Sequence, residues 1–182
     1  LLAILGNFIN RTVVLTHKYY QGVIPELGTP TALEQEVLNK IKEFPTSIGN
    51  SIEKFRFREA LAEYMNLARL GNKYLTDAEP WKKQKENPEA VKTILHVSLQ
   101  ICAALSVLGE PFLPFTAKKI QNMLNIDIHE WEKGGRTDLL KAGEKINSAE
   151  YLFENIDDAT IAKQIKKLED SKAKKLMEQT PA

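Results

Sequence analysis

Apolar residues recur at helical spacing along most of the chain, and no run of alternating apolar and polar residues extends beyond a few positions. The first helical pattern covers residues 1–22. Its apolar side collects Leu1, Leu5, Phe8, Ile9, Leu15 and Tyr19. We expect this side to face a core. Gly22, followed soon by Pro25, is typical of a helix C-terminus.

The opposite side of the same predicted helix forms a separate stripe. It consists of Asn7, Arg11, Val14 and Lys18. Asn in a helix interior competes with its own backbone for hydrogen bonds, so Asn7 and Asn10 cost helix stability. An Asn one turn before an Arg, about 6 Å along the axis, suits flat groups with mixed donors and acceptors, such as nucleobase edges. The same pair could instead cap or bond a neighbouring helix.

Further helices follow along the chain. They are predicted over residues 32–44, 57–77 and 88–108, and from 114 or 116 to 124. A further short helix is predicted to begin at residue 80. Thr31 with Glu34 three residues later predicts an N-cap, and Pro45 is expected to break the helix it follows. Residues 47–57 are interpreted as a short helix or an irregular lead-in. A glycine at position 71 predicts close packing against another helix, and Pro80 places Trp81 in the first turn of a short helix.

In the last third of the chain, apolar residues do not recur at regular helical spacing until the final segment. Residues 125–143 are expected to form an extended tail around the bundle, and residues 148–153 to hold a turn of helix. A final helix is predicted over residues 157–175, with Ile161, Ile165 and Leu168 facing inward. The fold class is therefore all-α, with a helical bundle over residues 1–125 and a tail and final helix of the same domain over 126–182.

Composition narrows the function classes. The chain has 182 residues, of which 43% are hydrophobic, and a net charge of only +1. Since binding through phosphates alone favours a basic excess, any nucleic-acid role must rest on a local site. The single Cys102 excludes an internal disulfide, which indicates either a reducing compartment or a fold that needs no disulfide. The apolar run 94–108 is interpreted as too short and too polar to span a membrane. The chain begins at Leu1 rather than Met, so we expect a piece of a longer protein.

No pattern of catalytic or metal-binding residues is recognisable. The sequence has no glycine-rich phosphate loop, no paired cysteines and no zinc spacing of histidines. His17, His96 and His129 have no acid or nucleophile at a diagnostic interval, and His96 on its apolar helix is interpreted as a core histidine. The Lys-rich end at 172–175 is interpreted as a solvated face. These observations favour a binding module without a catalytic site or a metal.

Six short motifs then carry a specific resemblance. They are GNFINR at 6–11, YQGVIP at 20–25, LARLGNKY at 67–74, EPWK at 79–82, PFLP at 111–114 and LFENID at 152–157. In this order they resemble the anticodon-binding domain of methionyl-tRNA synthetases, a helical bundle of class I synthetases with a tail that returns along it. The first five cover about residues 1–125.

The resemblance implies that the domain reads the CAU anticodon of a methionine-accepting tRNA. It assigns anticodon contact to Asn7, Arg11 and Trp81, with Asn10, Val14 and Pro80 in support. Physical chemistry agrees, because an indole offers a stacking face to unpaired bases while Arg and Asn offer hydrogen bonds to base edges. Without the resemblance, Trp81 would be interpreted as a packing residue beside a helix start.

The resemblance also implies a cytoplasmic parent enzyme that joins methionine to tRNA using ATP with Mg²⁺. Its catalytic domain, with any zinc site, would belong to the same longer chain, because neither catalytic signature of the family occurs here. This fragment itself is expected to hold no cofactor and to contact no membrane. Two alternatives remain open: the related domain of a leucyl, isoleucyl, valyl or cysteinyl synthetase, and a helical protein-interaction module.

Overall fold

The computed structural model describes residues 1–154 and 156–179, with side chains as far as residue 172. In this part of the chain the fold is helical and lacks strands, and a single isolated bridge pairs Val23 with Lys145. The elements in chain order are η1 (Leu2–Gly6), α1 (Asn7–Tyr20), α2 (Ala32–Glu53), α3 (Phe57–Ala78), α4 (Pro80–Lys83), α5 (Pro88–Leu108), α6 (Pro114–Leu124), η2 (Trp131–Gly135) and α7 (Asp158–Gln179). The predicted all-α class is confirmed.

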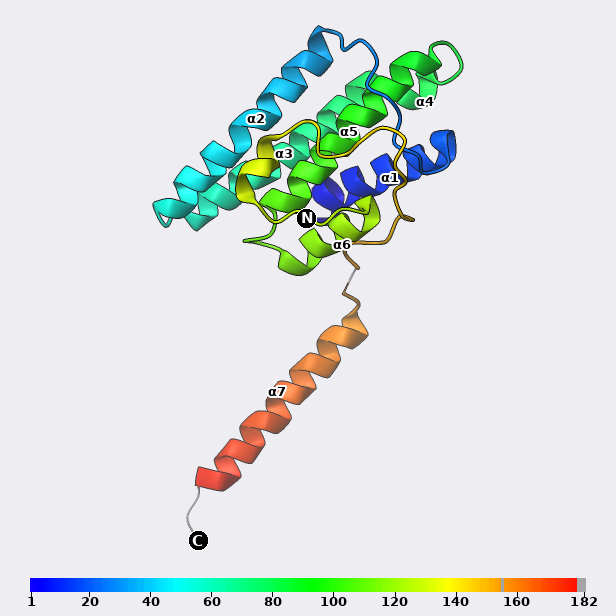
Figure 1. Cartoon of the computed structure of the whole chain (residues 1–182). Helices are drawn as coiled ribbons and strands as arrows, with labels where there is room; N and C mark the ends of the chain where they lie inside the picture. Colours follow the sequence, from blue (N-terminus) through cyan, green and yellow to red (C-terminus); the bar gives the residue numbers. More distant parts are fainter. Residues whose placement is uncertain (155, 180–182) are drawn as a thin grey trace. The chain divides into compact units, whose positions relative to one another are not determined.

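Residues Leu1–Leu152 make one compact unit, and α5 is its central helix. It contacts α1, α2, α3, α4, α6 and η2, as its place in the middle of Figure 1 illustrates. Pro88 at its first position and Gly109 just after its end set the bounds predicted from sequence. By length and hydropathy α5 could cross a membrane, contrary to expectation, but 94% of its most apolar window is buried inside the protein. It is therefore a core helix, hydrophobic on all sides because it is covered on all sides.

Helix α2 does not end before Pro45, which corrects the sequence prediction. It continues through Pro45 to Glu53 and also absorbs most of the segment expected to be a separate short helix or lead-in. A proline removes one backbone donor, but here tertiary contacts hold the helix. The indole Nε1 of Trp131 donates to the carbonyl of Pro45 at 3.1 Å, and Gly135 packs against the proline ring. Packing from η2 thus outweighs the local cost.

The predicted cap of α2 is present and extends into the core. The carboxylate of Glu34 accepts hydrogen bonds from the backbone and hydroxyl of Thr31, which forms a capping box. Its other oxygen accepts from the Tyr74 hydroxyl of α3 at 3.1 Å. Burial raises the pKa of Glu34, but the bonds from Thr31 and Tyr74 outweigh it, so the pKa lies below its ordinary value. The charged group therefore ties α2 to α3.

The buried side of α1 is rotated from the one expected. Its buried residues are Leu5 of the preceding η1 and Phe8, Ile9, Thr12, Val13 and Thr16 of α1. Leu1 is exposed, and Leu15 and Tyr19 are only half-buried, so these three predictions are wrong. Threonine was not expected in the core, but the Thr16 hydroxyl donates to the Thr12 carbonyl at 2.9 Å and is satisfied there. The polar stripe of α1 faces outward as expected.

Helix α1 is fixed against α3 by two contacts. A Cβ at Gly71 would lie 2.5 Å from the ring of Phe8, so only glycine permits this approach. The neighbouring Asn72 donates its side-chain amide to the Ile4 carbonyl of η1 at 2.7 Å. The close helix packing predicted at Gly71 is confirmed.

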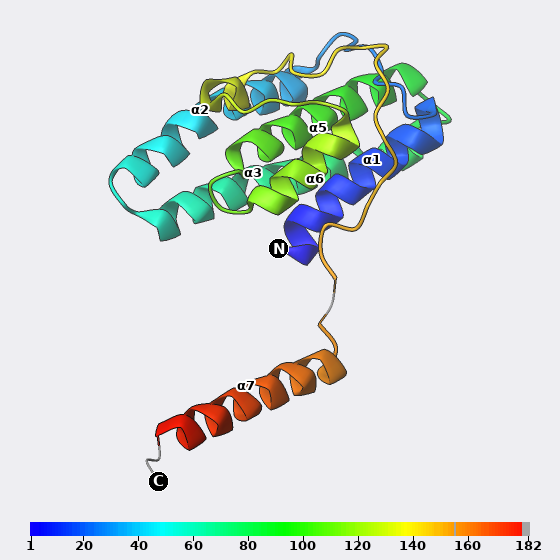
Figure 2. The same ribbon diagram turned by 60° about the horizontal axis from the view of Figure 1, so that its bottom comes forward.

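The tail to residue 152 wraps the compact unit, as expected (Figure 2). Gln100 of α5 donates to the carbonyl of Leu140 at 2.8 Å and accepts from the backbone of the same segment. Further along, the backbone N–H of Ile146 donates to the Gly22 carbonyl at 2.9 Å. The helical turn predicted for residues 148–153 does not occur in the described residues, because the backbone there bonds to other elements or stays extended.

Helix α7 belongs to the second unit, which begins at Phe153. The stripe of Ile161, Ile165 and Leu168 was expected to face inward, yet these side chains are 46–57% exposed. Helical spacing creates such a stripe without supplying a surface to cover it. Asn155 of the tail motif, residues 180–182 and the side chains of the Lys-rich end beyond 172 lie outside the described part.

Candidate nucleic-acid interface

A sharp turn between α3 and α4 places Trp81 at the surface. Glu79 ends α3 in the left-handed conformation, at φ 47° and ψ 55°, a region that non-glycine residues seldom occupy. Pro80 then opens α4 at its first position, as the sequence predicted, and it is buried there. Lys82 holds the turn through an ion pair with Glu79 at 2.7 Å. Trp81, one residue into α4, is 38% exposed.

Arg11 of α1 lies over the indole of Trp81. Its guanidinium carbon is 5.1 Å from the ring centroid, a cation–π contact worth roughly 0.5–1 kcal/mol at an exposed site. Arg11 is half-buried, so its stem is held by neighbouring atoms while the planar head rests on the ring. The structure therefore joins two of the three residues that the sequence assigned to one site.

The other assigned residues of α1 lie beside Arg11. Asn7 is exposed one helical turn before it, about 6 Å along the axis. Val14 is 44% exposed on the same stripe, and Asn10 is half-buried at its edge. Polar amide, guanidinium and indole groups thus occupy a continuous side of α1 and the start of α4.

Several basic residues border this surface although the whole chain is nearly neutral. Helix α1 contains no acidic residue and carries Arg11 and Lys18. Lys82, Lys83 and Lys85 follow Trp81 within four positions. Sequence reasoning did not assign these lysines, although their clustering after the tryptophan was a visible signal. Asp77, Glu79 and Glu86 balance these three lysines, and Lys82 is paired with Glu79, so the excess of positive charge comes from α1.

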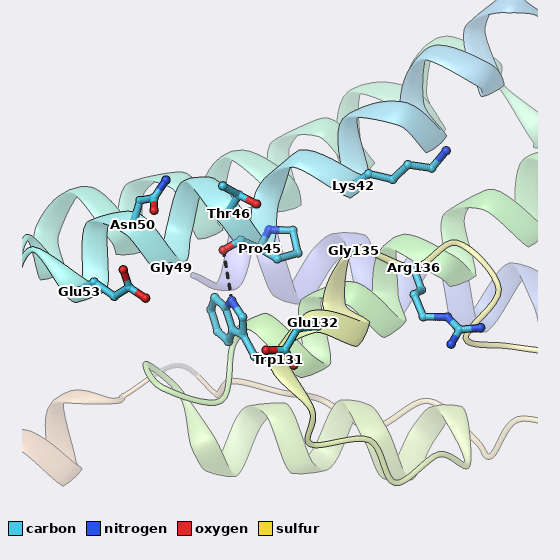
Figure 3. A pocket seen from close by; sticks show the side chains of 10 residues that line it. All are labelled: Lys42, Pro45, Thr46, Gly49, Asn50, Glu53, Trp131, Glu132, Gly135 and Arg136. Carbon is cyan, nitrogen blue, oxygen red and sulfur yellow. Dashed lines mark hydrogen bonds between the residues drawn. The ribbon is translucent and has the colours of Figure 1, made fainter.

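The second tryptophan has a different role. Trp131 lies beside Pro45, Gly49 and Glu53 in a pocket of about 460 Å³ between α2 and η2 (Figure 3). Its only ring donor is engaged by the Pro45 carbonyl, and a Cβ at Gly49 would already touch the indole at 3.3 Å. Trp131 therefore anchors η2 to α2. The ring of Trp81, in contrast, is 38% exposed and lies against Arg11.

The three histidines serve structural contacts. His96 is buried, donates through Nδ1 to the Pro25 carbonyl at 2.8 Å and accepts at Nε2 from Gln100, so the prediction of a core histidine is confirmed. His17 bonds the Asn147 carbonyl at 2.8 Å, and His129 lies between two carboxylates. These contacts pin loops and the tail to the helices.

No metal or redox centre is formed by the described side chains. Among them, no three His, Cys, Asp or Glu residues gather closely enough to hold a metal ion. Burial raises the pKa of the Cys102 thiol, so the thiol stays protonated inside the core. The candidate site is the surface of α1 and α4, where Arg11 lies over Trp81.

Comparison with known proteins adds an independent line of evidence. The family described as the anticodon binding domain of methionyl tRNA ligase matches residues 24–173. The methionine–tRNA ligase of Cytophaga hutchinsonii is 58% identical over 97% of this chain, which corresponds to 26% of that protein. The ligase of Flavobacterium johnsoniae is 48% identical over the full chain, which corresponds to 30% of that protein. This chain thus spans less than a third of the curated relatives it matches.

Solved structures agree at the level of fold. Apo Mycobacterium tuberculosis methionyl-tRNA synthetase superposes with a TM-score of 0.80 over 86% of this chain and 32% of that chain, at 19% identity. The same enzyme in complex with methionyl-adenylate gives a TM-score of 0.78 over 85% of this chain and 31% of that chain. Both comparisons support the helical architecture.

Proposed function

Because this chain belongs to the family of anticodon-binding domains of methionyl-tRNA ligases, we propose that Asn7, Arg11 and Trp81 bind the CAU anticodon of a methionine-accepting tRNA. The observation that carries the proposal is the placement of Arg11 over Trp81 at 5.1 Å. Arg11 and Trp81 come from helices far apart in sequence, and they meet on an exposed surface rather than in the core.

Each residue type has a distinct role in the proposal. The exposed part of the Trp81 indole stacks against an unpaired base, an interaction worth about 1–3 kcal/mol. Arg11, oriented by the ring, directs a planar set of donors toward base acceptors. Asn7 offers both a donor and an acceptor, which suits the mixed edges of cytosine and adenine. Bases of a single-stranded loop present these faces and edges together.

The remaining assigned residues support these three. Val14 extends the stripe with an apolar surface beside Arg11, and Asn10 borders it on α1. Buried Pro80 fixes the start of α4 and so the position of Trp81. The near-neutral net charge agrees with recognition through bases more than phosphates.

The longer protein would supply the chemistry. In this proposal it is a cytoplasmic ligase that joins methionine to its tRNA using ATP with Mg²⁺. The catalytic domain, its nucleotide site and any zinc site would belong to the longer protein, since this chain spans only 26–30% of its relatives. The role of the present domain is to select the tRNA, so that the catalytic domain receives the correct acceptor end.

An anticodon exchange tests the proposal. The full-length ligase is titrated with a tRNA that carries CAU and with matched transcripts that differ by one anticodon base. We expect each change to weaken binding by about tenfold or more, the equivalent of 1.4 kcal/mol. Equal affinity for all transcripts would contradict the proposal. A protein-interaction role would be favoured by two results together. The ligase would bind all transcripts with equal affinity, and the Trp81→Ala variant would lose binding to a helical partner protein.

A further inference from the structure

A pocket of about 490 Å³ lies where the loop before α2, the start of α2, α4 and the start of α5 meet. We call it the Thr93 pocket. Gly28, Leu33, Glu34, Lys83, Thr93 and Ile94 are among the residues that line it. Its volume falls within the range of about 300–1,000 Å³ that is typical of small-molecule sites. The pocket is therefore large enough for a ligand of that class.

The hydroxyl of Thr93 points to a ligand in this pocket. Thr93 of α5 is only 5% exposed, yet it lines the pocket. Ser98 of the same helix donates its hydroxyl to the Ile94 carbonyl at 2.8 Å, whereas the Thr93 hydroxyl makes no hydrogen bond to any described residue. A Cβ at position 28 would lie 2.7 Å from Oγ1 of Thr93, so Gly28 leaves this oxygen uncovered. Because a buried hydroxyl without a partner is costly, a hydrogen-bonding ligand in the pocket gives it a partner.

The charges of the lining favour a ligand with N–H donors. They are the carboxylates of Glu34 and Glu89 and the ammonium of Lys83, and Glu89 is paired with Lys92 at 2.7 Å. Burial raises the pKa of Glu34, but hydrogen bonds from its neighbours hold the pKa below its ordinary value, so this carboxylate is ionised. A carboxylate accepts hydrogen bonds from the amino group of a base such as cytosine. A phosphate would be repelled by Glu34 and could be held only beside Lys83.

The apolar part of the lining suits a planar ring. Ile94 is 2% exposed and Leu33 is 40% exposed, and both border the pocket. Lys83 follows Trp81 by two positions in α4, so the pocket adjoins the surface that carries Trp81. We propose that the Thr93 pocket binds one unpaired base with an exocyclic amino group, supplied by the loop of the bound tRNA outside its anticodon. This inference rests on the proposed anticodon-binding function.

Helix α4 then separates two base-binding positions. Side chains two positions apart on a helix point about 200° away from each other, so Trp81 and Lys83 lie on different sides of α4. An RNA loop whose bases are splayed apart, as in other single-stranded loops bound by proteins, passes over α4 with bases on both sides. The amino group of the additional base donates to Glu34, its edge bonds to the Thr93 hydroxyl, and Lys83 meets the adjoining phosphate.

A cycle that combines RNA and protein changes tests the proposal. The full-length ligase is titrated with a CAU-bearing anticodon stem-loop RNA and with copies that each lack the base of one loop nucleotide outside the anticodon. We expect one of these abasic RNAs to bind about tenfold more weakly or worse. Thr93→Val removes the hydroxyl and should weaken binding of the intact RNA about three- to tenfold, as for one hydrogen bond. The same variant should have no further effect on that abasic RNA, because the two changes remove one contact.

Thr12→Val is the matched control. The Thr12 hydroxyl is also buried without a hydrogen-bond partner, but it lies inside the core, so this variant should leave RNA affinity unchanged. Urea denaturation should show that neither variant loses stability, because neither removes a hydrogen bond within the protein.

Three results would overturn the proposal: equal losses of affinity with both variants, no abasic position that depends on Thr93, or a dependent position occupied by uracil, which lacks an amino group. Trp81→Ala and an anticodon exchange, measured in the same assay, separate the two proposals. If they weaken binding while Thr93→Val does not, only the Thr93 pocket is refuted. If they leave binding unchanged, the anticodon-binding function fails, and the inference that rests on it fails too.

Discussion

The guanidinium of Arg11 rests 5.1 Å from the centre of the Trp81 indole, although seventy positions separate the two residues. Two features of the fold produce this arrangement. Gly71 and Asn72 of α3 hold α1 in place through Phe8 and Ile4. The left-handed Glu79 then redirects the chain so that α4 begins beside α1. The surface is thus built by close helix packing together with one costly turn.

The Trp81 ring is expected to contribute to RNA affinity rather than to stability. Trp81→Ala should weaken binding of CAU-bearing tRNA by about 1–3 kcal/mol, because a stacked base loses its platform. Trp81→Phe keeps an aromatic face and should lose less. Because the side chain is partly exposed, Trp81→Ala should lower the free energy of unfolding by less than it weakens the free energy of tRNA binding. Equal binding by wild type and Trp81→Ala would refute the stacking role.

Gly71 is expected to tolerate no side chain. A Cβ would meet the Phe8 ring at 2.5 Å, and such overpacking costs about 1–3 kcal/mol, enough to exceed the gain of roughly 1 kcal/mol from alanine in a helix. Urea denaturation of Gly71→Ala should therefore show lower stability. Gly49→Ala, also in a helix but with its nearest contact at 3.3 Å, is the matched control and should be nearly neutral. A stabilised Gly71→Ala protein would contradict the packing described for α1 and α3.

His129 is expected to give stability a measurable pH dependence. Hydrogen bonds first to Glu110 and then to Asp127, at 2.8 and 3.0 Å, raise the pKa of His129 above its ordinary value. Because the pKa of His129 is raised in the folded state, its contribution to stability is complete below the unfolded pKa of about 6.5. This contribution is lost as the pH rises through the folded pKa. The difference in unfolding free energy between wild type and His129→Gln should therefore shrink from mildly acidic to alkaline pH. An NMR titration that gives the His129 imidazole a pKa at or below its ordinary value would contradict this pH-dependent stabilisation.

Local signals in the sequence were sufficient for much of the fold. Pro88 and Gly109 bound α5, Thr31 with Glu34 starts α2, and Pro80 opens α4, because each acts through its own backbone or its nearest neighbours. The exposure of the Asn7 stripe followed from helical spacing alone.

Other features depended on distant partners and could not be predicted this way. The continuity of α2 through Pro45 rests on Trp131, 86 positions later. The burial of Thr12 and Thr16 reflects which side of α1 meets α3 and α5, which spacing does not specify. Within the site, the pairing of Trp81 with Arg11 followed only from family resemblance, since nothing in the local pattern links two helices seventy residues apart.

The central claim is that Arg11, positioned by Trp81, reads anticodon bases, and one comparison tests it most directly. The affinity of the full-length ligase for CAU-bearing tRNA and for an anticodon-exchanged transcript is measured for wild type, Arg11→Ala and Lys18→Ala. Both variants remove one positive charge from the exposed stripe of α1, but only Arg11 lies over the indole. We predict that Arg11→Ala weakens CAU binding by about 1–3 kcal/mol and removes most of the discrimination, whereas Lys18→Ala weakens both RNAs slightly and equally. Full discrimination retained by Arg11→Ala would contradict the claim.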